Sequence, residues 1–153
     1  MMIQSIRSRW QRLWLVGQAT VILTLTRVGL RLLGFRRWFA LLDRLARLSL
    51  RPLPAEKSER YLLQALRAVK VATDKTMPPQ KWSTSCLLRS LTYWYLLRRR
   101  GLAAQLRFGT RQDPTAPFEA HAWVEYEGRR LAGGMPSEKF IPFDEEITPR
   151  RVS

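Results

Sequence analysis

The stretch that decides the fold is STSCLLRSLTYWYLLRRRG, residues 83–101. Its serines and threonine are favourable helix N-cap residues, and apolar side chains recur at helical spacing through residues 86–99. The arginines at positions 98–100 suit the negative C-terminal pole of a helix, and Gly101 is a typical residue just past a helix end. The stretch therefore predicts a helix that begins at Cys86, the single cysteine of the chain.

The residues after this helix favour strands. Residues 103–108, 120–126 and 129–132 are predicted as strands, and Glu127-Gly128 predicts the tight turn between the last two. Residues 140–143 predict a final short strand.

The residues before it favour helices. Apolar periodicity predicts helices at 8–33, 37–50 and 58–71, with a break at Gly34, and residues 74–81 are interpreted as a linker. Helices followed by strands indicate the α+β class.

Length and composition limit the possible functions. A chain of 153 residues supports one domain, which we divide into a basic helical region at 1–75, a compact core at 76–145 and a frayed tail at 146–153. One cysteine excludes an intramolecular disulfide and favours a cytoplasmic setting. One cysteine and one histidine do not make a metal-ligand cluster, so no metal is expected.

The net charge of +15 fits nucleic acid, an anionic membrane surface or an acidic peptide, but it also fits simple solvated helix faces. No nucleic-acid motif accompanies the charge, so no specific nucleic-acid partner is expected. Near the N-terminus the uncharged stretch 13–26 is shorter than the roughly 20 residues of a spanning helix. It is interpreted as an amphipathic or core helix, and peripheral membrane contact stays open.

Cys86 and His121 have the local settings that a thiol hydrolase needs. Helix N-termini favour the thiolate form of a cysteine, and a nearby imidazole can take the thiol proton and return it to a leaving amine. Strand alternation places His121, Trp123 and Glu125 on one face of the strand 120–126. Taken alone, Cys86 fits a buried structural cysteine, and His121 fits a structural histidine whose hydrogen bonds are satisfied. Taken together, their order in the chain and their local settings favour catalysis.

The sequence resembles a known family at five places. These are CLLRSL at 86–91, LLRRRG at 96–101, AHAWVE at 120–125, Gly128 and FIPF at 140–143. Together they resemble the stand-alone peptidase half of lasso-peptide biosynthesis B proteins, which are transglutaminase-like cysteine proteases within the papain-like superfamily. The resemblance covers about residues 82–143.

The resemblance implies a transglutaminase-like core with Cys86 as nucleophile and His121 as base. It implies a leader peptidase without a cofactor that acts in the maturation of a ribosomally made peptide. Its expected partners are a precursor peptide, a separate leader-recognition protein and a lasso macrolactam synthetase.

The family's third catalytic member is an aspartate on the strand that returns after the histidine. A hairpin centred on Glu127-Gly128 places His121 opposite about Gly134, and neither Gly133 nor Gly134 has a side chain. Glu125 lies about 13 Å along the strand from His121, too far to orient the ring. A backbone carbonyl or a water could instead accept the imidazole N–H of His121. So could another carboxylate, that of Glu119, Glu138 or Asp144.

Two more residues belong to the candidate site. Gln80 lies six residues before Cys86, where papain-like enzymes place an oxyanion-hole side chain, although a loop glutamine is usually just solvated. Trp82 and Trp123 could wall a peptide groove, although indoles at such positions are more often core.

Three alternatives to a leader peptidase stay open. A weak protease or pseudoenzyme fits the missing aspartate. A transglutaminase-like acyltransferase would use the same Cys86 and His121. A non-catalytic basic helical adaptor would bind nucleic acid, membrane or an acidic peptide.

Overall fold

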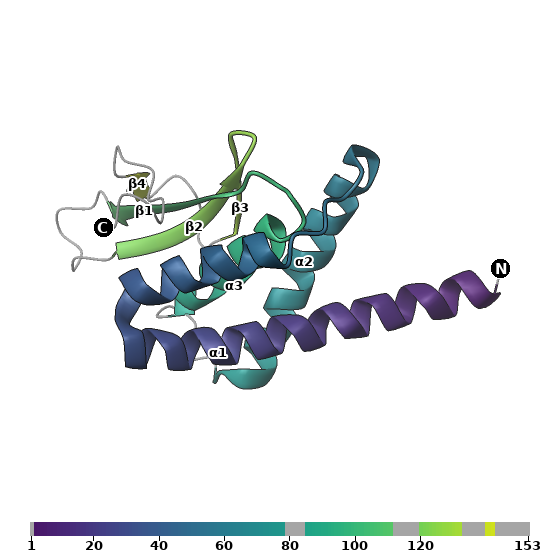
Figure 1. The fold of residues 1–153 in the computed structure, drawn as a ribbon, viewed down its shortest axis with the longest axis horizontal. Coiled ribbons are helices and arrows are strands. Elements are labelled where there is room, and N and C mark those ends of the chain that lie inside the picture. The colour runs from purple at the N-terminus through teal and green to yellow at the C-terminus, as the bar shows by residue number, and fades with distance from the viewer. Residues whose placement is uncertain (1, 79–84, 112–119, 133–139, 143–153) are drawn as a thin grey trace.

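The computed structural model describes residues 2–78, 85–111, 120–132 and 140–142 (Figure 1). In chain order the elements are α1 (Met2–Leu48), α2 (Ala55–Thr76), α3 (Cys86–Arg98), β1 (Gln105–Arg111), β2 (Ala120–Tyr126), β3 (Arg129–Ala132) and β4 (Phe140–Pro142). Helices followed by an antiparallel sheet confirm the α+β class.

Helix α1 is two helical limbs joined at Gly34. Gly34 has φ 73° and ψ 171°, a conformation that is essentially restricted to glycine, so the predicted break is confirmed. Figure 1 shows the chain reversing direction there. The limbs pack closely, because a Cβ atom on Gly29 would lie 2.2 Å from the ring of Trp38. The absence of a side chain at Gly29 therefore allows the two limbs of α1 to pack against each other.

Helix α2 is longer than the predicted helix 58–71. It begins directly after Pro54 and continues to Thr76, so the expectation that residues 74–76 belong to a linker is wrong. Ala72 and Thr73 are buried near its end. Contact with the core thus extends the helix past the point where the apolar pattern weakens.

Helix α3 is the centre of the molecule, and each residue from Ser90 to Leu97 is buried. Two tyrosine hydroxyls tie it to α2, because Tyr61 donates to the carbonyl of Leu96 at 3.2 Å and Tyr93 donates to that of Leu62 at 2.9 Å. Burial raises the pKa of both tyrosines, which keeps the hydroxyls protonated as donors. Helices α1, α2 and α3 and the sheet contribute to a common hydrophobic core.

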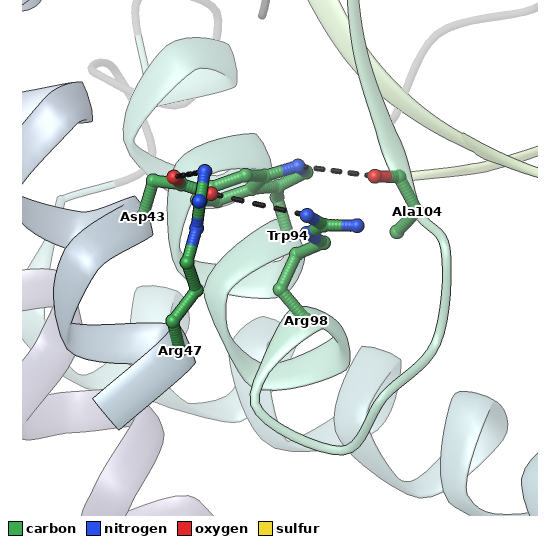
Figure 2. A network of polar contacts seen from close by, with 5 residues as sticks. All are labelled: Asp43, Arg47, Trp94, Arg98 and Ala104. Carbon is green, nitrogen blue, oxygen red and sulfur yellow. Dashed lines mark hydrogen bonds and ion pairs between the residues drawn. The ribbon is translucent and has the colours of Figure 1, made fainter. Parts of the chain in front are cut away.

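A polar cluster joins the second limb of α1 to the C-terminal half of α3 (Figure 2). Asp43 is buried and pairs with Arg47, and Nη2 of Arg98 lies 3.9 Å from its other oxygen. Beside this cluster, Nε1 of Trp94 donates to the carbonyl of Ala104 at 3.1 Å. The two arginines supply the charge that a buried carboxylate requires.

The sheet has the strand order β3-β2-β1-β4, and neighbouring strands are antiparallel. Strand β1 spans residues 105–111 instead of the predicted 103–108, because its pairing with β2 continues to Thr110 opposite Ala120. The predicted turn between β2 and β3 is confirmed. Glu127 and Gly128 both have positive φ, at 50° and 73°, as a tight two-residue hairpin turn requires.

Candidate functional site

Cys86 is the first residue of α3 and is half-buried. The N-cap position is occupied by Ser85, which is buried. Its side chain makes no capping hydrogen bond to the first turn of α3, a turn that the structure describes in full. The backbone N–H groups of that turn point toward the N-terminal end of the helix, where Cys86 lies.

The topology places the start of α3 at the same end as the start of β2. Helix α3 ends at Arg98, and the chain turns at Gly101, which has φ 77°, before it enters β1. Strand β1 thus returns alongside α3, and β2 is antiparallel to β1. Helix α3 and strand β2 therefore run in the same direction, with Cys86 first in one and His121 second in the other.

A buried hydrogen bond fixes this arrangement. The hydroxyl of Ser90 donates to the backbone carbonyl of Ala122 at 2.9 Å. Cys86 lies one helical turn before Ser90 on the same face of α3, and His121 is the chain neighbour of Ala122. The bond thus joins helix and strand within one turn of Cys86 and one residue of His121. Sequence reasoning missed it; the available signal was a small polar residue at i+4 from the cysteine in an apolar helix.

His121 is buried, with 6% of its surface exposed, and its ring stacks on Trp123. The ring centroids are 6.4 Å apart and the planes differ by 21°. Trp123 is fully buried, and Arg130 of β3 places its guanidinium 4.0 Å from the ring centroid. Trp123 is thus a buried support beside His121.

Glu125 completes the polar face of β2. It accepts a hydrogen bond from Nε1 of Trp123 at 2.8 Å, and its second oxygen lies 3.2 Å from Nε of Arg107. The predicted alternation of His121, Trp123 and Glu125 is therefore confirmed. The opposite face of β2 contributes Val124 to the hydrophobic core. Both oxygens of Glu125 are engaged away from His121, which agrees with the expectation that this carboxylate does not orient the imidazole.

The hairpin count toward a third catalytic residue changes at a β-bulge. Tyr126 faces Arg129 as predicted, but the pairing shifts between Val124 and Glu125, so Val124 faces Ala132. A count without a bulge therefore places the wrong residue opposite Val124. The residues proposed around the pair, Gln80, Trp82, Glu119, Gly133, Gly134, Glu138 and Asp144, lie outside the described residues.

A family model described as the transglutaminase-like superfamily matches residues 28–143, more than two thirds of the chain, and spans both Cys86 and His121. Neither the curated proteins nor the solved structures gave a match.

Proposed function

This chain belongs to the transglutaminase-like superfamily, and from that premise we propose that it is a cysteine peptidase that cleaves a leader peptide through an acyl-enzyme on Cys86. The superfamily generally contains cysteine hydrolases and acyltransferases. The observation that carries the proposal is the shared end of α3 and β2, held by the bond from Ser90 to Ala122. It supports Cys86 and His121 as a working pair.

The proposed reaction uses the chemistry of those two side chains. His121 takes the proton of the Cys86 thiol, and the sulfur attacks the carbonyl carbon of the scissile peptide bond. The carbon–nitrogen bond then breaks, and the imidazolium gives its proton to the leaving amine. Water, deprotonated by His121, cleaves the thioester and restores the thiol. The backbone N–H groups in the first turn of α3 are suitable donors for the oxyanion.

The substrate class rests on the sequence resemblance to lasso-peptide B proteins at CLLRSL, AHAWVE and FIPF. By that resemblance the substrate is a ribosomally made precursor in the cytoplasm, presented by a separate leader-recognition protein. The trimmed product passes to a macrolactam synthetase. Residues 76–145 are the peptidase core in this proposal, residues 1–75 are a basic helical region that packs on it, and no cofactor takes part.

The decisive experiment incubates the purified chain with precursor and leader-recognition partner and follows leader release by mass spectrometry. Cys86→Ala is expected to abolish cleavage, and His121→Ala to lower kcat/KM by about 10³-fold or more. Ser49→Ala, which removes a solvent-exposed hydrogen bond directly after the end of α1, is the control and retains wild-type rates. Unchanged cleavage by a folded Cys86→Ala variant contradicts the proposal.

An acyltransferase is the second candidate, because the superfamily contains acyltransferases as well as cysteine hydrolases. Both reactions share the acyl-enzyme and differ in whether water or an amine resolves it. Adding an amine donor to the same assay separates them, because an acyltransferase yields the amide in place of the free acid. If no acyl-enzyme forms and leader release is the same in wild type and Cys86→Ala, the chain is the non-catalytic adaptor.

A further inference from the structure

The first limb of α1 carries an exposed apolar stripe. Seven large apolar side chains of the limb are between 47% and 78% exposed, and all of them except Leu13 form this stripe: Trp10, Trp14, Val21, Leu25, Val28 and Leu32. Their spacings of 4, 7, 4, 3 and 4 residues place them on a single face of a straight helix. We call this set the outer stripe; from Trp10 to Leu32 it spans 23 residues, about 33 Å at a rise of 1.5 Å per residue. An exposed apolar surface of this length indicates a binding face.

The opposite face of the same limb packs against the rest of the protein. Leu15, Ala19, Leu23 and Thr26 are buried in the core side of α1. The part of α1 from Arg9 to Leu48 contains an 18-residue window apolar enough to cross a membrane, with 28% of that window buried. A spanning orientation would strip this buried face from the core and would have to accommodate the reversal at Gly34. A helix with one face packed and one face exposed fits a position on a surface instead.

The positive charge of the limb favours an anionic surface as its binding partner. Residues 1–42 contain seven arginines and no aspartate or glutamate. At 100° per residue, Arg9, Arg27 and Arg31 fall along one flank of the outer stripe, and Arg9 and Arg31 are exposed. Long arginine side chains at such a flank can reach anionic headgroups while the apolar face enters the acyl boundary.

The shape of the molecule makes the stripe accessible. In Figure 1 the N-terminal end of α1 projects beyond the other elements. Trp10 and Trp14 belong to this end of the limb, and both are about 70% exposed. Tryptophan favours the boundary between headgroups and acyl chains, because its ring is apolar and its N–H needs a polar partner.

We propose that the outer stripe binds the surface of an anionic lipid bilayer, with α1 parallel to the membrane plane. A second copy of the chain is a poorer occupant, because pairing two such limbs brings arginines together without acidic residues to neutralise them. The inference does not depend on the peptidase proposal, since it involves neither Cys86 nor His121.

The test is flotation of the full chain with vesicles of phosphatidylcholine and phosphatidylglycerol in equal parts, against vesicles of phosphatidylcholine alone. The wild type is expected to bind the anionic vesicles at least about tenfold more strongly. The double variant Leu25→Glu/Leu32→Glu, with both changes in the outer stripe, is expected to lose that binding. The control Leu48→Glu/Leu50→Glu adds the same charge at residues that are 76% and 50% exposed outside the stripe, and it retains most of the binding.

Thermal melting of each variant establishes that it is folded, since all four positions are solvent-exposed in the wild type. Equal binding to both kinds of vesicle, or equal loss in both double variants, overturns the proposal. So does a wild-type dimer in light scattering that Leu25→Glu/Leu32→Glu converts to a monomer without any vesicle binding, because the stripe would then be an interface between copies.

Discussion

The two ends of β2 are held in different ways. At its start, His121 is buried and the neighbouring Ala122 accepts the buried hydrogen bond from Ser90 of α3. At its far end the hairpin turn is exposed, and Arg129 pairs with Glu59 of α2 at 2.8 Å on the surface. The first kind of contact resists water and salt, whereas the second is screened by both. The protein thus has its firm attachment at the end that carries the candidate catalytic pair.

This difference matters because a catalytic constellation must be held within a fraction of an ångström by side chains that are themselves fixed. His121 stacks on Trp123, and Trp123 is held in turn by Glu125 and Arg130. The support therefore extends along β2 from the buried end toward the middle of the strand. Changes along this line are expected to have smaller effects toward the hairpin.

The largest expected effect comes from Trp123→Ala. Removing a fully buried indole typically costs about 3–5 kcal/mol in the free energy of unfolding. Urea denaturation of this variant is compared with Tyr126→Ala, the partly buried aromatic nearer the hairpin, where the loss should be clearly smaller. Equal losses at the two positions would remove the contrast between the ends of β2.

The next effect comes from Ser90→Ala. It leaves the buried carbonyl of Ala122 without its side-chain donor, which typically costs about 1–3 kcal/mol. Ser58→Ala is the matched control, because its hydroxyl is exposed and lies 3.4 Å from the carbonyl of Pro54. Urea midpoints measure both. If Ser90→Ala is as mild as Ser58→Ala, the bond does not anchor α3 to β2.

The sequence predicts the elements of the fold whose position depends on neighbouring residues. The strands 120–126 and 129–132 and the break at Gly34 agree with their predictions, because glycine and alternation act within a few residues. The element boundaries that the sequence does not predict depend on contacts with residues far away in the chain. The start of β1 is set by pairing with β2, and the extension of α2 to Thr76 by burial against the core. The pairing of Cys86 with His121 stays a prediction, and the bond that brings their elements together joins residues 32 apart in sequence.

The smallest expected effect lies at the exposed end. The hydrogen bond from Arg129 lowers the pKa of Glu59 from its ordinary value of 4.5. A lowered folded-state pKa means that the pair stabilises the fold above the unfolded value and loses that contribution as pH falls through the folded one. Urea midpoints of the wild type and Glu59→Gln should therefore differ slightly near neutral pH and converge in acid. Salt should shrink the neutral difference, because the pair is exposed. A difference that survives both acid and salt would mean that the hairpin end is held as firmly as the end at His121.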